Sequence, residues 1–173
     1  IGYWRYEIDL EKLTWSNEVY GIWGRNKEGF EVNFKNLMTT IHPEDRESYL
    51  ETQKLSIKGE IDQDIVYRIV LPDGQIKWVQ ELGRLLKDEN GNTVVFDGAV
   101  QDITKQKTEE QQIKVLQGIV TKTTDSIVIT EAEPFDEPGP RIVYVNEAFT
   151  TMTGYLASEV IGKTPRILQG PKT

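Results

Sequence analysis

The sequence predicts an α+β domain built on an antiparallel sheet of about five strands, followed by a helix and the beginning of a second domain. Three observations support this fold class. Segments with a hydrophobic period of two open the chain and recur after residue 59. Short turn-forming runs join the later segments, which favours hairpins and therefore antiparallel pairing. Residues at helical spacing lie between the two groups of strands, so helices should cover one face of the sheet.

The beginning of the chain is predicted to form a hairpin and a short helix. Residues 3–8 alternate between apolar and polar side chains, as a half-buried strand does. A polar turn separates them from a second strand at 13–15. Ser16 or Asn17 can cap a short helix, and Gly24 can end it.

Two further helices are expected before the remaining strands. Apolar residues between positions 34 and 41 recur at i, i+3, i+4 and i+7, which places them on one helical face. Pro43 suits the first position of the next helix, and the acidic residues after it suit the positive end of the helix dipole. That helix should stop at Gly59.

Strands joined by hairpins should complete the domain. Residues 65–71 and 94–100 are rich in β-forming residues. Residues 72–74 (Pro-Asp-Gly) form a turn in which proline presets φ and glycine supplies a positive φ. Residues 88–92 are predicted to form a second hairpin turn. Between the two turns, side chains alternate between the two faces of a predicted strand. One face carries Ile76, Trp78 and Leu82, and the other carries Lys77, Val79 and Glu81.

The composition narrows the chemistry that the chain can perform. Its 173 residues carry a formal charge of -8, which argues against nucleic-acid binding, because nucleic-acid-binding proteins are usually basic. There is no cysteine and one histidine, His42, so thiolate nucleophiles and cysteine-ligated metal centres are impossible. We recognise no catalytic nucleophile–base pair or metal cluster and expect a non-catalytic region. No apolar run approaches the ~18 residues of a membrane helix, and the lack of cysteine suits a reducing setting, so we expect a cytoplasmic location.

A polar segment at residues 105–121 is predicted to form a linker helix. Ile113, Leu116 and Val120 lie at i, i+3 and i+7 and form a short apolar seam. We interpret the seam as a contact between two copies of the chain in a homodimer. The alternatives are a homodimer through the outer face of the sheet and a single amphipathic helix packed on its own domain.

The pattern of the opening residues then begins again. Strands are predicted at 127–129 and 141–145, and Asn146 can cap a following helix. Residues 15–20 resemble residues 144–149 at an offset of 129 positions, which suits tandem domains. We therefore expect a complete domain, a linker helix and the first half of a second domain, at residues 1–104, 105–121 and 122–173.

A series of motifs follows one another along the first of these parts at ordered spacings. They are Trp15-Ser16-Asn17-Glu18 with Gly24, Ile41-His42-Pro43-Glu44-Asp45-Arg46, Tyr67-Arg68-Ile69, Pro72-Asp73-Gly74, Ile76-Lys77-Trp78-Val79, and Gly98 with Asp102-Ile103-Thr104. The set resembles a PAS domain with its C-terminal PAC motif. The resemblance implies a five-stranded antiparallel sheet flanked by helices, within a larger signal-transduction protein. Typical proteins of this kind are histidine kinases of two-component systems and the enzymes of cyclic-di-GMP signalling.

Two groups of residues are candidate sites in the first domain. Aromatic side chains can line a small-molecule cavity between sheet and helices, or they can simply fill the core. These aromatic residues are Trp4, Tyr20, Trp23, Tyr67 and Trp78. Asp102 and Thr104 lie on either side of Ile103, and their side chains can cap the linker helix. The resemblance to PAS domains implies that this Asp-Ile-Thr motif transfers the signal to the helix. Arg68 is a candidate ion-pair partner for Asp102.

In the second domain, residues 162–170 resemble the loop and helix of the light-oxygen-voltage subgroup of PAS domains. That subgroup has a reactive cysteine where this chain has Pro165 and an asparagine where it has Thr164, so a flavin–cysteinyl adduct cannot form. The candidate pocket residues of this domain are Asn146, Arg166 and Gln169. Arg166 and Gln169 match positions that face the flavin in the subgroup.

The resemblance implies a sensory and dimerisation module that relays a ligand-dependent or conformational signal through the linker helix. The effector domain would lie in the same chain. We expect no cofactor and no metal, while an unidentified small molecule can occupy the cavity. The alternatives are a ligand-free scaffold that pairs output domains, and a sensor that carries flavin or haem. His42 is the only imidazole available to haem, but its place before a proline favours helix capping.

Overall fold

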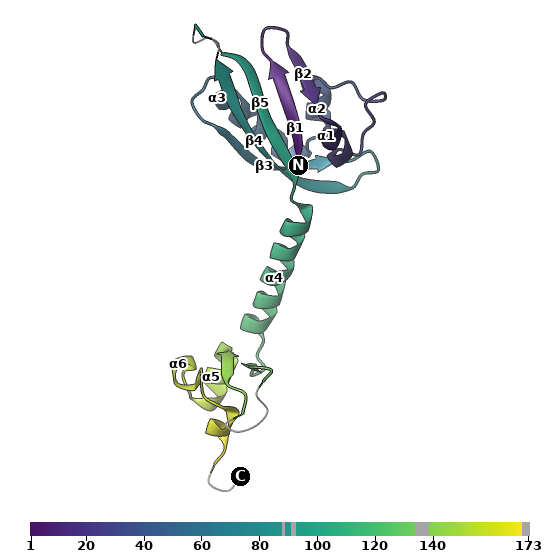
Figure 1. Ribbon diagram of the computed structural model, residues 1–173. Helices are drawn as coiled ribbons and strands as arrows, with labels where there is room; N and C mark the ends of the chain where they lie inside the picture. Colours follow the sequence, from purple (N-terminus) through teal and green to yellow (C-terminus); the bar gives the residue numbers. More distant parts are fainter. Residues whose placement is uncertain (88, 91–92, 134–138, 171–173) are drawn as a thin grey trace. The chain divides into compact units, whose positions relative to one another are not determined.

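The computed structural model describes residues 1–87, 89–90, 93–133 and 139–170. The chain divides into two compact units, Ile1–Glu109 and Glu110–Thr173 (Figure 1). Most of the turn predicted at residues 88–92 lies outside the described residues. We describe each unit by itself.

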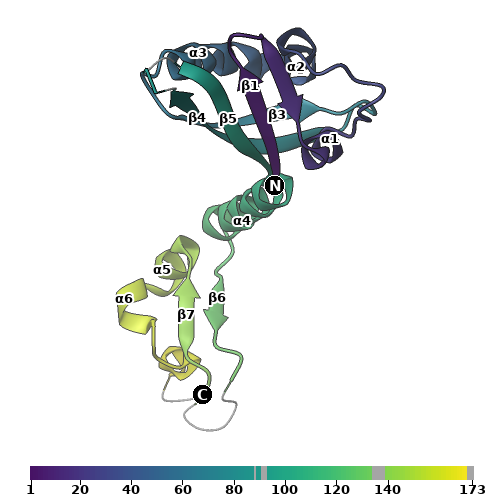
Figure 2. The ribbon, with the colours of Figure 1, turned by 45° about the horizontal axis from the view of Figure 1, so that its top comes forward.

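The first unit is a five-stranded antiparallel sheet with helices on one face, so the predicted α+β class is confirmed (Figures 1 and 2). The strand order is β2-β1-β5-β4-β3, in which the first strand pairs with the last. The elements are β1 (Gly2–Glu7), β2 (Lys12–Trp15), α1 (Asn17–Ile22), α2 (Phe34–Thr40), η1 (Pro43–Asp45), α3 (Arg46–Ile57), β3 (Gln63–Val70), β4 (Ile76–Lys87) and β5 (Thr93–Asp102).

Local sequence signals account for most of these boundaries. Ser16 precedes α1 as its N-cap, and Asn33 caps α2 through a hydrogen bond from the backbone N–H of Asn36. Gly59 follows α3 with a φ of 74°, and Gly74 closes the turn before β4 with a φ of 84°. The single helix predicted from Pro43 is instead a 3-10 turn, η1, followed by α3.

The core lies between the inner face of the sheet and helices α1, α2 and α3. Alternate residues of each strand point into it, as the period of two requires. On β4 the inner set contains Val79, fully buried, and Glu81, 6% exposed, whereas Ile76 and Leu82 are 44% and 48% exposed. Hydrophobicity alone would predict that the other face of β4 is buried, because the side chains on its outer face are more apolar than those on its inner face.

Two glycines make room for a tryptophan across the middle of the sheet. Gly98 on β5 and Gly83 on β4 are paired neighbours, and Trp4 on β1 pairs with Gly98. A Cβ atom at Gly98 would lie 2.7 Å from the Trp4 ring and 1.9 Å from the carbonyl oxygen of Leu82. The indole therefore lies close over both glycines, where any larger residue would displace it.

The helix α4 (Thr104–Lys122) begins at the end of β5 and contains no buried residue. Of its large apolar residues, Ile113, Val115, Leu116 and Ile119 are exposed, whereas Val120, the third residue of the predicted seam, is half-buried. Among the residues that the structure describes, no helix is both long enough and apolar enough to cross a membrane.

The second unit has a two-stranded sheet and short helices packed on it. Its core is formed by Ile142, Val145, Phe149 and Val160. Its elements after α4 are β6 (Val128–Thr130), β7 (Ile142–Val145), α5 (Glu147–Thr153), α6 (Ala157–Val160) and η2 (Pro165–Leu168).

The internal repeat is visible in the structure, with a correction of one residue. Asn146 is the N-cap residue of α5 and Ser16 is that of α1, although only Asn146 also caps its helix through the side chain. The Asn146 side chain accepts a hydrogen bond from Ile127 N, just before β6, and the Ser16 side chain accepts one from Tyr3 N in β1. The structural counterpart of Asn146 is therefore Ser16 rather than Asn17, and the offset is 130 rather than 129.

Candidate functional site

A cavity of about 340 Å³ lies between the inner face of the sheet and the helices of the first unit. Most of its wall is aromatic or aliphatic, and its polar lining comes from three tyrosines, a glutamine and two glutamates. The lining residues are Trp4, Tyr6, Glu11, Leu13, Trp15, Val19, Trp23, Phe34, Leu37, Tyr49, Gln53, Ile57, Tyr67, Glu81, Phe96 and Val100.

The structure brings together three of the five aromatic residues predicted to line a pocket. Trp4, Trp23 and Tyr67 line the cavity and are buried. Tyr20 does not line it but packs edge-on against Trp15, with ring centroids 5.5 Å apart. Trp78 lies on the outer face of β4, with the Arg68 guanidinium 5.4 Å from the centre of its ring.

One end of the cavity holds a buried polar network that the sequence did not reveal. Glu81 accepts a hydrogen bond from Gln63 Nε2 at 2.7 Å through Oε1, and another from the hydroxyl of Tyr67 through Oε2. Gln53 Nε2 donates to the hydroxyl of Tyr49 at 2.9 Å, and the Tyr49 and Tyr67 rings pack edge-on. A glutamate at an inner position of β4 was the available signal, but it required knowledge of which face is buried.

Burial dominates the electrostatics of this network. It raises the pKa of Glu81 to about 7, although hydrogen bonds from Tyr67 and Gln63 act in the opposite direction. Burial, with a further contribution from the charge of Glu81, raises the pKa of Tyr49 and Tyr67 well above that of a free phenol. Both phenols therefore stay protonated, while Glu81 changes charge near neutral pH.

The predicted signal-transfer residues meet at the junction of β5 and α4. Asp102 Oδ1 accepts from the backbone N–H of Thr104 at 2.9 Å and from its hydroxyl at 2.6 Å, which caps the helix. Asp102 Oδ2 pairs with Lys77 Nζ at 3.0 Å. Burial alone would raise the pKa of Asp102, but the hydrogen bonds from Thr104 and Lys77 outweigh it and the pKa lies below its usual value.

The same junction is attached to β4 through Trp78. The backbone N–H of Trp78 donates to Thr104 Oγ1 at 3.0 Å, and its carbonyl accepts from the backbone N–H of the buried Ile103 at 2.9 Å. The next inner residue of β4 after Trp78 is Val79, and Glu81 follows two positions later. The start of α4 is thus bonded to the strand that forms part of the cavity wall.

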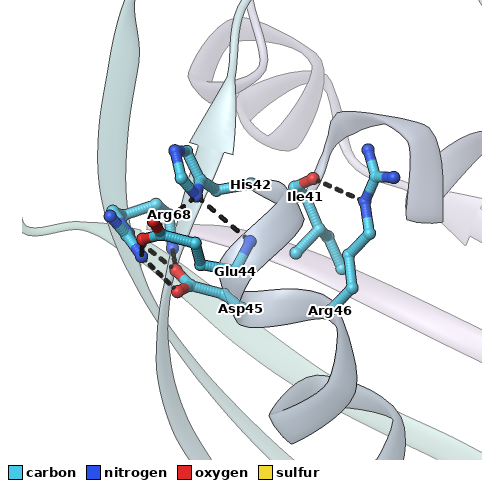
Figure 3. Close-up of polar contacts among 6 residues, drawn as sticks. All are labelled: Ile41, His42, Glu44, Asp45, Arg46 and Arg68. Atoms are coloured by element: carbon cyan, nitrogen blue, oxygen red, sulfur yellow. Dashed lines mark hydrogen bonds and ion pairs between the residues drawn. The ribbon is translucent and has the colours of Figure 1, made fainter.

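Arg68 does not pair with Asp102 but with the acidic residues of η1 (Figure 3). Its guanidinium donates to both oxygens of Asp45, at 2.6 and 3.0 Å, and to Glu44 Oε2 at 2.8 Å. The backbone N–H of Arg68 donates to the same Asp45. Hydrogen bonds from Arg68 hold the pKa of Asp45 below its usual value despite partial burial. Arg68 therefore fixes η1 to β3 and reaches the junction only through the ring of Trp78.

His42 lies at the start of η1 and outside the cavity. Its Nδ1 accepts a 3.4 Å hydrogen bond from the backbone N–H of Glu44, which makes it the N-cap of η1 (Figure 3). His42 is not among the residues that line the cavity. Within the described residues, no group of three or more metal-ligating side chains lies close enough to hold a metal ion.

In the second unit, the three candidate pocket residues lie in different surroundings. Asn146 is buried, and all of its hydrogen bonds go to backbone groups. Its Oδ1 accepts from Ile127 N and Phe149 N, and its Nδ2 donates to the carbonyls of Val120 and Asp125. Arg166 and Gln169 are exposed on and after η2. Asn146 is therefore a structural clamp that holds the last turns of α4 to α5 and β6.

Comparison with known proteins agrees with this architecture. A blue-light-activated histidine kinase of Brucella ovis is 31% identical over 110 residues, which are 64% of this chain and 22% of that protein. The chain therefore spans about a fifth of the length of the curated relatives that it matches.

Solved structures share the fold. A sensory box histidine kinase/response regulator from Burkholderia thailandensis superposes with a TM-score of 0.57 at 23% identity, over 68% of this chain and 87% of that one. The N-terminal domain of a diguanylate cyclase with PAS/PAC sensor from Marinobacter aquaeolei superposes with a TM-score of 0.55 at 20% identity, over 61% and 96%.

The family assignment rests on two sequence profiles. The profile of the PAS fold matches residues 12–100, and that of a PAS domain matches residues 124–173. Since the first match alone covers more than half of the chain, the chain belongs to the PAS domain family and is a sensory module of the kind found in signal-transduction proteins.

Proposed function

We propose that this region is non-catalytic and that it converts the state of the cavity into a change at the start of α4. The single observation that carries the proposal is the junction at which β4, β5 and α4 share hydrogen bonds. Trp78 on β4 holds Ile103 and Thr104, while Asp102 caps the helix and pairs with Lys77 of β4. A shift of β4 that follows occupation of the cavity would change the cap and thereby the position or stability of α4.

The downstream partner would be an effector domain in the same chain. The matching blue-light-activated histidine kinase is about five times as long as the matched region. The solved structures that share the fold come from a histidine kinase/response regulator and a diguanylate cyclase. A histidine kinase or a cyclic-di-GMP enzyme is therefore the parent that we propose. We further propose that the module works without flavin or haem, since the chain has no cysteine to form a flavin adduct and its one histidine caps η1.

We also propose that α4 pairs two copies of the chain. It has 19 residues, or about 28 Å at 1.5 Å per residue, and none is buried. Its exposed Ile113, Val115, Leu116 and Ile119 fall within one half of the helix circumference, which suits burial against an identical helix. Light scattering should show a dimer that dissociates in Leu116→Asp and persists in Gln111→Asp, which adds the same charge on the other side of the helix. A monomeric parent protein would contradict this pairing.

The test of the relay compares two aspartates of the same strand. Asp102→Ala removes the cap and should cost about 1 kcal/mol in the first turn of α4, seen as faster hydrogen exchange of the amides at residues 104–107. Asp97→Ala is the control, because Asp97 pairs with Arg5 and Arg84 but has no bond to α4. In the parent protein, Asp102→Ala should abolish the signal response and Asp97→Ala should preserve it. Equal exchange and equal responses in both variants would refute the relay.

A further inference from the structure

We propose that the cavity binds a small organic cation, whose ammonium group pairs with Glu81 between the aromatic walls. This inference names the ligand class of the site described above and therefore rests on its proposed sensory function. The first argument is the sign of the charge. The charged side chains that line the cavity are Glu11 and Glu81, and no lysine, arginine or histidine lines it among the described residues.

The second argument is that Glu81 lacks a cationic partner within the described part of the chain. Its hydrogen-bond donors, Gln63 and Tyr67, are both neutral. Two other carboxylates of the first unit that are partly buried have a basic partner: Asp45 pairs with Arg68, and Asp102 pairs with Lys77. Glu81 is buried more deeply than either, so its negative charge is the least compensated of the three. A ligand with a positive charge would supply the missing partner.

The third argument is the aromatic wall, which attracts cations through the electron-rich faces of its rings. Trp15 and Trp23 lie with ring centroids 5.0 Å apart on one side of the cavity, and Trp4 packs edge-on against Phe96 at 5.0 Å. Tyr67 belongs both to this wall and to the network of Glu81. Aromatic walls around a carboxylate favour an ammonium group over a neutral or anionic one.

The fourth argument concerns the rest of the ligand. Trp4 lines the cavity and is buried, and its indole Nε1 has no hydrogen-bond partner in the described part of the chain. Buried polar atoms without partners are uncommon in folded proteins, so an unused donor indicates a ligand acceptor. The expected ligand is therefore an amine with an apolar body and one oxygen or nitrogen acceptor, small enough for about 340 Å³.

The experiment is calorimetric titration of the whole chain at pH 8, where both Glu81 and alkylammonium groups are charged. The cationic probes are tyramine, benzylamine and choline, and the matched probes are benzyl alcohol and benzoate. We expect at least one cation to bind at least tenfold more tightly than both matched probes. Glu81→Gln should weaken that binding at least tenfold, whereas Glu11→Gln, which removes one charge near the entrance, should change it less than threefold.

A second measurement needs no substitution at Glu81. Binding of the same cation to the wild-type chain at pH 5.5 should be at least tenfold weaker than at pH 8, because Glu81 is then protonated. The other titratable groups that line the cavity are Glu11, Tyr6, Tyr49 and Tyr67. Burial raises the pKa of Tyr49 and Tyr67 well above this pH range, and repeating the titration in Glu11→Gln measures what Glu11 contributes.

Three results would overturn the proposal: no binding of any cation, equal binding of benzyl alcohol or benzoate, or unchanged binding in Glu81→Gln. A neutral or anionic ligand that binds and alters hydrogen exchange in α4 would overturn the ligand class and leave the relay intact. Cation binding that leaves α4 unchanged would support the ligand class and count against the relay.

Discussion

Glu81 should make the stability of the first unit fall as the pH rises towards neutrality. Burial raises the pKa of its carboxyl from an ordinary value of 4.5 to about 7 in the folded chain. Because the pKa is higher in the folded state, the stabilising contribution of the bound proton is complete below about pH 4.5 and is lost as the pH rises through about 7. The difference between the two pKa values corresponds to about 3 kcal/mol.

The substitution that tests this is Glu81→Gln, which keeps the shape of the side chain and removes its ionisation. At pH 4.5 the variant should be about as stable as the wild type, and at pH 8 it should be more stable by about 3 kcal/mol. Urea unfolding followed by tryptophan fluorescence is the assay, because the four tryptophans, at positions 4, 15, 23 and 78, all lie in the first unit.

Glu51→Gln on the exposed side of α3 is the matched control and should show no such change between the two pH values. Since other carboxyl groups also titrate, the informative quantity is the difference between wild type and Glu81→Gln at each pH. A difference that stays constant from pH 4.5 to pH 8 would show that Glu81 does not titrate abnormally, and the reasoning from its burial would be wrong.

Three further predictions concern packing and the second unit. Gly98→Ala places a Cβ atom against the backbone carbonyl of Leu82 and the ring of Trp4. It should lower the free energy of unfolding, measured with urea, by about 3 kcal/mol or more. Gly118→Ala on α4 is the control, because a Cβ atom there meets open space. Asn146→Ala should lower the stability of the second unit by about 2 kcal/mol. Asn146→Asp should keep the bonds accepted from Ile127 and Phe149 while losing those donated to the carbonyls of Val120 and Asp125. Hydrogen exchange separates the two: unprotected amides at 127 and 149 in Asn146→Asp would contradict this assignment of its bonds.

Much of the fold could be predicted because its signals are local. Hydrophobic period, proline and glycine positions and capping residues depend on neighbours within a few positions, so the sequence predicts most helices and strands to within a few residues. The short helix α6 is an exception, because four residues carry too little periodicity to predict it. The pairing of β1 with β5 was not predicted, since it joins residues that are far apart in the sequence and leaves no local signal.

The site was predicted less well than the fold, for the same physical reason. Trp78 was placed in the pocket because tryptophan is usually buried, yet its ring packs outside against Arg68. Glu81 was overlooked because an isolated carboxylate avoids the interior, and its partners Gln63 and Tyr67 come from a strand 14 to 18 positions earlier. Only the folded chain shows that these neutral groups meet around it.

The pairing of β1 with β5 also affects how such a unit can be combined with others. Gly2 lies opposite Val100, so the chain enters the sheet and leaves it on adjacent strands, about 5 Å apart. A domain whose two ends are neighbours can be inserted between existing segments, duplicated or deleted while the flanking chain remains nearly continuous. Recombination of such domains can therefore produce tandem PAS units joined by one helix, as in this chain.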